Sequence, residues 1–155
     1  MADRQLVAAE PIHAELLADD LFPITAREAR LLTGKPPLDA LLESLDLAEE
    51  AWTYLIDGVP ASMAGVRPHP QNDDFGLLWV VSTPRIYRAK IGFLRESRAM
   101  AEEWMERFEV LGNLVHSENE PTISWAEWLR FFVDRDSPVI IGGETFFPCV
   151  RKRGG

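Results

Sequence analysis

The chain is short of cysteine and histidine, and each shortage excludes a class of site. Cys149 is the only cysteine among 155 residues, so no disulfide can form within the chain. The three histidines, His13, His69 and His116, are widely spaced and make no metal-site pattern with one cysteine. No serine lies in a G-x-S-x-G sequence, the motif of many serine hydrolases. The sequence therefore favours neither a disulfide scaffold, nor a metal centre, nor a serine hydrolase.

Long hydrophobic runs and a surplus of positive charge are also missing. No stretch approaches the ~20 apolar residues of a membrane-spanning helix, and the polar first residues predict no secretory signal. The net charge is −9, and the basic residues cluster only at 85–90 and in the tail 151–153. A nucleic-acid-binding domain usually carries a basic face. We therefore expect no membrane span and no nucleic-acid partner, whereas the acidic balance could suit a basic protein surface.

The composition, 46% hydrophobic and 26% charged, is that of a globular domain with a real core, and we expect one domain over residues 1–155. A short strand is expected over 4–9. Three helices follow: one over about 12–21, one from a capping box at Thr25–Glu28 to Gly34, and one over 38–48. The first third is thus predicted to be mostly helical.

The hydrophobic period then changes from that of a helix to that of a strand. Trp52, Tyr54 and Ile56 alternate and lead to Asp57-Gly58, a strong hairpin signal. A partner strand is predicted over 59–66 and a loop over 67–74. The apolar run 76–81 predicts a buried strand, the basic segment 85–92 follows it, and a long amphipathic helix is expected from about 93 to 108.

The last third is expected to return to the sheet. Residues 110–115 form either a strand or the end of the long helix. A second capping box, Ser124–Glu127, predicts a helix, and 139–141 and 145–147 flank Gly142-Gly143 as a closing hairpin. These elements predict an α/β (α+β) domain with a mixed, mostly antiparallel sheet flanked by helices.

This order of elements resembles the GNAT N-acetyltransferase fold over nearly the whole chain. Residues 57–66 (DGVPASMAGV) look like the second and third strands of that fold, and Asn119 with the helix and Phe131-Phe132 looks like its last conserved segment. The series 76–83, 93–98 and 111–115 is closer to GNAT-like proteins of tailed bacteriophages, including small internal virion proteins of short-tailed phages. This resemblance implies a protein partner in the virion or the host, and a location in the virion or the cytoplasm of the infected bacterium.

The resemblance also implies an acetyl-CoA site beside residues 82–93. Active members carry R/Q-x-x-G-x-G/A there, whereas this chain has Gly92 as its only glycine in RAKIGF. Their last helix often carries a tyrosine as general acid, and here Trp125 and Trp128 stand instead. The cofactor-binding residues that we carry over from the resemblance are Val81, Ser82, Arg88, Lys90, Gly92 and Asn119.

Three side chains are weak candidates for a catalytic base. Glu50 precedes the strand of Trp52, and Asp74 precedes the central strand; each could be a base if burial raised its pKa, and the alternative, which we favour, is a surface carboxylate. His116 has a suitable ordinary pKa, and the alternative is a histidine with a structural hydrogen bond.

Two functions from different classes follow. The first, which we favour from sequence, is a phage-encoded GNAT-fold protein with a degenerate acetyl-CoA site that recognises another protein through its aromatic last helix. The second is an active acetyl-CoA-dependent N-acetyltransferase acting on an amine of a protein or a small molecule. The sequence alone does not decide whether the protein is an enzyme, because a fold does not establish chemistry.

Overall fold

The computed structural model describes residues 3–154, which form one mixed sheet covered on both faces by helices. The strand order is β1-β2-β3-β4-β5-β8-β6, and β7 pairs with β8. The strands are β1 (Arg4–Ala8), β2 (Glu50–Ile56), β3 (Val59–His69), β4 (Asn72–Ser82), β5 (Val110–His116), β6 (Phe132–Val133), β7 (Val139–Ile141) and β8 (Glu144–Lys152). The helices are α1 (Pro11–Ala18), α2 (Pro23–Thr33), α3 (Pro37–Leu47), a 3₁₀ helix η1 (Pro84–Ala89), α4 (Lys90–Arg107) and α5 (Glu120–Trp128).

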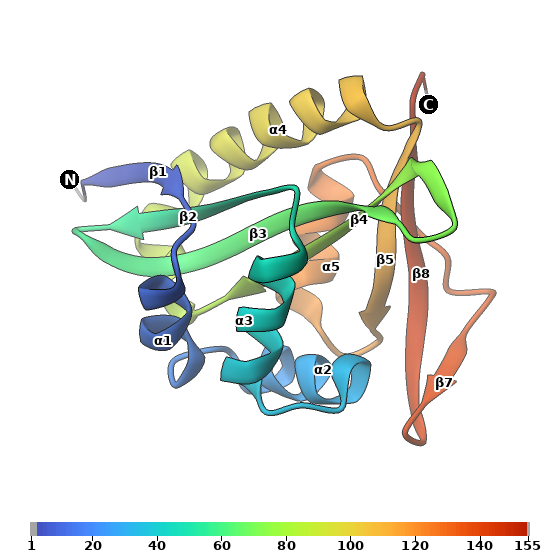
Figure 1. Cartoon of the computed structure of the whole chain (residues 1–155), viewed down its shortest axis with the longest axis horizontal. Coiled ribbons are helices and arrows are strands. Elements are labelled where there is room, and N and C mark those ends of the chain that lie inside the picture. The colour runs from blue at the N-terminus through green and yellow to red at the C-terminus, as the bar shows by residue number, and fades with distance from the viewer. Residues whose placement is uncertain (1–2, 155) are drawn as a thin grey trace.

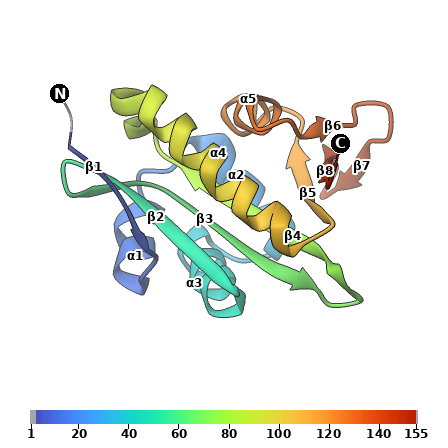
Figure 2. The same cartoon turned by 90° about the horizontal axis from the view of Figure 1, so that it is seen from above.

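Strands β1 to β4 form an antiparallel meander whose two faces carry separate cores. Successive side chains of a strand alternate between faces. Met63 and Val81 therefore pack with α1 and α3, whereas Ala64 and Leu78 pack with Trp104 of α4 and the rest of the larger core. Figures 1 and 2 show α1 and α3 on one side of this meander and α4 and α5 on the other.

Strands β4 and β5 separate from each other after a short contact. They pair in parallel only over Phe75–Leu77 and Val110–Gly112. Beyond that point β5 continues as the antiparallel partner of β8 and runs steeply away from β4 (Figure 1). The sheet therefore contains a wedge-shaped gap, which opens towards α2.

Both predicted capping boxes are wrong. Helix α2 begins at Pro23, two residues before Thr25, and α5 begins at Glu120, four residues before Ser124. A proline occupies the first turn in each case, where its fixed φ favours helix initiation and its missing N–H costs nothing. The cap of α5 is Asn119, whose side-chain oxygen accepts from the Thr122 N–H at 3.3 Å.

The predicted loop over 67–74 is also wrong, because β3 extends to His69 and β4 begins at Asn72. Pairing with the opposite strand outweighs the turn-forming residues, and the irregularity is confined to a register shift at Pro68/His69. The Asp57-Gly58 hairpin is confirmed, with φ of 52° and 76° as a type I′ turn requires. The closing hairpin is confirmed too, and residues 110–116 form a strand.

Candidate functional site

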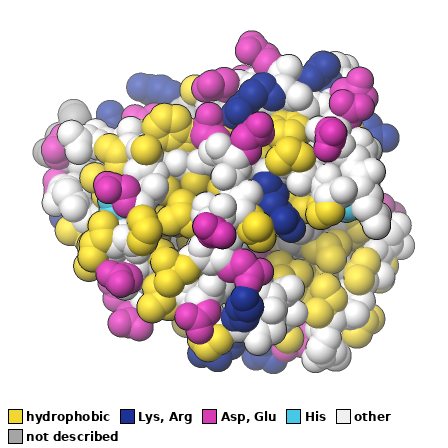
Figure 3. Space-filling view, in the orientation of Figure 1, with side chains coloured by type: hydrophobic (Ala, Val, Ile, Leu, Met, Phe, Trp, Pro, Cys, Tyr) yellow, Lys and Arg dark blue, Asp and Glu magenta, His cyan; other side chains and the backbone are white. Residues whose placement is uncertain are grey.

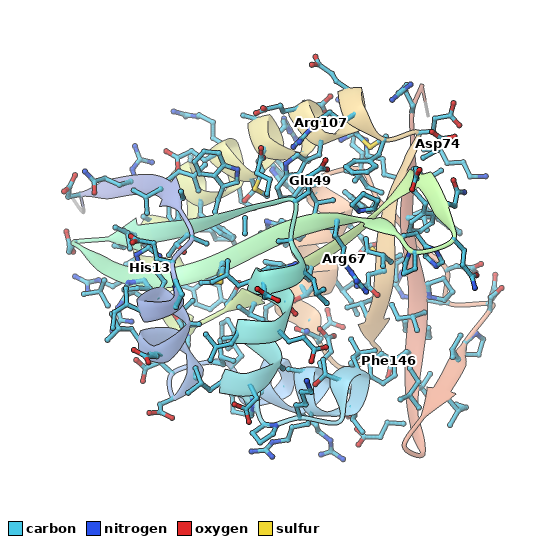
Figure 4. All side chains as sticks on the ribbon, viewed as in Figure 1. His13, Glu49, Arg67, Asp74, Arg107 and Phe146 are labelled. Atoms are coloured by element: carbon cyan, nitrogen blue, oxygen red, sulfur yellow. The ribbon has the colours of Figure 1, made fainter. Side chains whose placement is uncertain are left out.

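A cavity of ≈ 420 Å³ lies at the gap between β4 and β5, on the face that carries α2 and α3. Figure 3 shows it as a hollow lined by hydrophobic side chains, and Figure 4 labels Arg67 at its rim. Its walls are largely apolar, with three charged side chains: Glu28, Glu43 and Arg67. A concave, mostly apolar site with a few charged groups is the usual form of a small-molecule site.

Glu28 of α2 is the buried carboxyl of this cavity, at 8% exposure. Its Oε2 accepts from the backbone N–H of His116 at 2.8 Å and from the Asn119 side-chain amide at 3.0 Å. Burial raises the pKa of Glu28, and these two hydrogen bonds oppose that rise only in part. Because both bonds go to one oxygen, Oε1 is left for other partners.

His116 lies next to Glu28, and both nitrogens of its ring form hydrogen bonds. Its Nδ1 accepts from the Glu118 N–H at 3.0 Å, so Nε2 carries the proton and donates to Glu144 at 2.7 Å. Arg27 holds the other oxygen of Glu144, at 2.7 Å from Nη2. Bonds from Arg27 and His116 keep the pKa of Glu144 below its ordinary value. His116 therefore has no free nitrogen for a substrate proton, and it positions Glu28 through its backbone.

His116, Glu118 and Glu144 also offer three atoms within 4.8 Å of one another, as a metal site would. Arg27 already neutralises Glu144, and the protonated Nε2 of His116 faces the same carboxylate. A cation would have to displace both, so the donor set is that of a salt-bridge network.

The edge of β4 offers a free peptide group to the gap. The Asn113 side-chain amide donates to the Leu78 carbonyl at 3.1 Å, and the Phe22 N–H donates to the Ser82 carbonyl at 3.1 Å. Peptide groups on one edge of a strand recur at every second residue. The peptide group of Val80 therefore faces the gap, as those of Leu78 and Ser82 do. Strand β5 has turned away at this point, and Val80 has no ladder partner there within residues 3–154.

A second, much smaller cavity of ≈ 20 Å³ lies on the α4 face of the sheet. Val80 and Trp125 line both cavities, so these two residues lie between them at the gap. The Trp125 side chain is buried, and its indole N–H has no hydrogen-bond partner among the residues described. The gap thus has a cavity on each face of the sheet.

The start of α4 gathers positive charge beside this smaller cavity. Among residues 3–154 no side chain caps α4, and the first turn of this helix holds no acidic residue. The Arg4 guanidinium lies directly against Gly92, in the space that a Cβ there would fill. Burial, with the negative charge of Glu96, raises the pKa of Tyr54, and Arg4 opposes this rise. The Tyr54 hydroxyl is buried in that region without a partner in the described chain. A helix N-terminus with adjacent cations is a favourable place for an anion.

The predicted cofactor-binding residues fall into two groups. Arg88, Lys90 and Gly92 lie together at the start of α4, with Arg88 paired to Asp57 at 3.2 Å and Lys90 over the ring of Tyr87.

The other three, Val81, Ser82 and Asn119, make contacts within the folded chain. Val81 packs into the core of α1 and α3, and Ser82 Oγ lies 3.0 Å from Ser62 Oγ. Asn119 is fully buried, and its side chain is used by Glu28 and by the cap of α5. Their role towards a cofactor stays a prediction.

Two of the predicted catalytic carboxylates lie away from the cavity. Glu50 accepts from the indoles of Trp52 and Trp104 and pairs with Arg107; although burial acts to raise its pKa, these groups together lower it. Asp74 is exposed near the β3–β4 turn, and Figure 4 shows it well apart from Arg67 at the rim of the cavity. Glu28 and Arg67, which do line the cavity, were missed by sequence reasoning. Glu28 resembled a capping residue and Arg67 a loop residue, so no local signal marked them.

The aromatic last helix is only partly buried. Trp125 of α5 belongs to the core, as does Phe131 just beyond the helix, whereas Trp128 at the end of α5 is 46% exposed and Phe132 of β6 is 63% exposed. The Arg98 guanidinium lies 4.3 Å from the ring centroid of Trp128 and covers part of it. Cys149 is a buried free thiol, and burial raises its pKa to about 12.

No protein family profile and no curated protein matches the sequence. The fold, in contrast, matches many solved acetyltransferases. One is a GNAT acetyltransferase from Streptococcus pneumoniae (16% identity, TM-score 0.64, 98% of this chain and 100% of the other). Another is a putative acetyltransferase from Salmonella typhimurium with its cofactor acetyl-CoA (15%, 0.65, 96% and 93%). A third is an aminoglycoside acetyltransferase in complex with coenzyme A (12%, 0.64, 97% and 95%).

These likenesses extend over nearly the whole of both chains, but at identities that establish the fold alone. The separated central strands, the helices on both faces and the mostly antiparallel sheet agree with that result. The chain has the GNAT acetyltransferase fold.

Proposed function

We propose that this protein is an acetyl-CoA-dependent N-acetyltransferase whose general base is Glu28. The observation that carries the proposal is a buried carboxyl, with a raised pKa, lining a cavity at the gap between β4 and β5 that shares Val80 and Trp125 with a second cavity on the α4 face. A general base works best when its pKa lies closer to the working pH than that of an exposed carboxyl does.

The residues on the α4 face fit acetyl-CoA in two places. The start of α4, with Arg4, Arg88 and Lys90 near it, suits the negative phosphates, although side-chain charge there replaces a glycine-rich cradle. The free peptide group of Val80 suits an amide of the pantetheine arm. When bound, acetyl-CoA supplies an activated acetyl thioester.

The chain's own residues would then serve the amine. Glu28, in its ionised form, attracts an ammonium group into the cavity and accepts a proton from it, leaving a nitrogen lone pair. The bonds from His116 N–H and Asn119 fix one carboxyl oxygen, so that the other keeps a defined direction. The apolar walls limit water in the cavity and strengthen these charge interactions.

The test is acetyl transfer from acetyl-CoA to a panel of amines, followed by release of free thiol. Replacement Glu28→Gln keeps the size and the acceptor oxygen but cannot take a proton, so we expect a loss of roughly 10²–10⁴-fold in kcat/KM. Glu103→Gln, on the exposed face of α4, is the matched control and should retain full activity. Equal activity of Glu28→Gln and the wild type would refute the role of Glu28.

A second candidate, the phage recognition protein with a degenerate site, is favoured by the exposed Trp128 and Phe132. Such a protein would act on a virion or host protein, in the virion or in the infected cell. It predicts that Trp128→Ala abolishes capture of a defined partner while acetyl-CoA fails to bind. Measured acetyl transfer would count against it.

A further inference from the structure

Arg67 of β3 is a charged residue of the cavity. It lies opposite Leu77 in the β3–β4 ladder, on the face that carries Met63 and α3, and it is partly buried. In the part of the chain that the structure describes, its side chain forms no ion pair and no hydrogen bond. Figure 4 shows it between the meander and β5, at the hollow of Figure 3.

The other charges of the cavity do not neutralise Arg67. Glu43 is paired with Lys35 at the outer edge of α3. Glu28 is held by His116 and Asn119. The cavity therefore presents one uncommitted guanidinium and one buried carboxyl to a ligand. A guanidinium binds a carboxylate through two parallel hydrogen bonds, and partial burial strengthens such a pair.

We infer that the acceptor of the acetyl group is a small amino acid, whose carboxylate binds Arg67 and whose amino group faces Glu28. This inference rests on the proposed function for the transfer step, but the binding it describes stands by itself. The ≈ 420 Å³ cavity is of the size of small-ligand sites, and its walls from Leu32, Leu47 and Leu77 suit an apolar side chain.

The same arrangement excludes other amines. A polyamine or an aminoglycoside would bring further positive charge to Arg67 and gain nothing there. An amine without a carboxylate would leave the guanidinium without a partner in a partly buried place, and a site built for a polar group discriminates against ligands that lack it.

The first experiment measures binding without acetyl-CoA. Amino acids and their C-terminal amides are titrated into the protein and followed by NMR; the members of each pair differ in the charge of one group. We expect the acid to bind roughly 10- to 100-fold more tightly than its amide, as for a hydrogen-bonded charged pair. Arg67→Gln should remove that preference, whereas Arg95→Gln, with the same charge change on the exposed face of α4, should keep it.

Equal binding of acids and amides to the wild type, no binding of either, or a preference that survives Arg67→Gln would overturn the inference. The second experiment repeats the panel with acetyl-CoA and measures thiol release. Turnover of amides as fast as acids refutes the inference alone. Acid binding through Arg67 without any transfer supports the inference and refutes the proposed function, so the two failures are distinguishable.

Discussion

At the scale of single residues, the proposed function depends on Glu28, whose carboxyl group is buried. Glu28 binds its proton more tightly in the folded protein than in the unfolded chain, because burial raises its pKa. The free energy of unfolding must therefore fall as the pH rises from the ordinary carboxyl pKa through the folded value. Glu28→Gln has no proton to lose and lacks this fall.

The stability of Glu28→Gln relative to the wild type should thus increase between pH 4 and pH 8. Urea denaturation at a series of pH values measures this difference, with Glu103→Gln, at an exposed position, as the control whose difference stays flat. A constant difference for Glu28→Gln would show that the Glu28 pKa is not raised by folding.

This residue could not be found from the sequence. The two donors to Glu28 lie 88 and 91 positions away along the chain, and no local pattern encodes such a contact. The three predicted catalytic candidates rest on local features: Glu50 and Asp74 each precede a predicted strand, and His116 has a suitable ordinary pKa. Of these, only His116 lies near the cavity, and its ring bonds to Glu118 and Glu144 there.

At the scale of elements, the narrow end of the gap depends on close contact between β5 and β8. A Cβ at Gly112 would lie 2.5 Å from the Cys149 carbonyl oxygen and 2.8 Å from Val150 Cγ1. The first is a backbone atom of the paired strand and cannot turn away, so Gly112→Ala should lower the free energy of unfolding by about 1–3 kcal/mol.

Gly92→Ala is the matched control, because the new methyl group meets the flexible end of Arg4 rather than backbone. It lies in a helix, where alanine is favoured over glycine, and should cost no stability. Chemical denaturation of both variants measures the difference; equal stabilities would contradict the close packing at Gly112.

Elements were predictable where local chemistry decides them. Asp57-Gly58 and Gly142-Gly143 supply the positive φ of tight hairpins, and both hairpins form. Helix starts were less predictable, because α2 begins at Pro23 and not at Thr25, and Asn119 rather than Ser124 caps α5. Strand β3 continues past residue 66 to His69, and β4 begins already at Asn72. Both extensions depend on pairing between the two strands, which turn propensity cannot show.

At the scale of the whole molecule, the proposed function depends on two cavities on opposite faces of the sheet, which share Val80 and Trp125 at the gap between β4 and β5. The order of elements in the sequence was enough to predict the GNAT fold, because each element has a local pattern. The cavity is different: α2, α3, β3, β4, β5 and α5 all contribute to it, and its existence follows only from their packing. None of the described helices is long and apolar enough to cross a membrane.

The most direct test of the central claim is a calorimetric titration of acetyl-CoA into the purified protein, with Arg88→Glu beside it and Arg95→Glu as the matched control. Saturable binding in the micromolar range, lost in Arg88→Glu and kept in Arg95→Glu, is the result that the account predicts. No heat and no thermal shift with millimolar acetyl-CoA would contradict it, and the acetyltransferase proposal would then be abandoned.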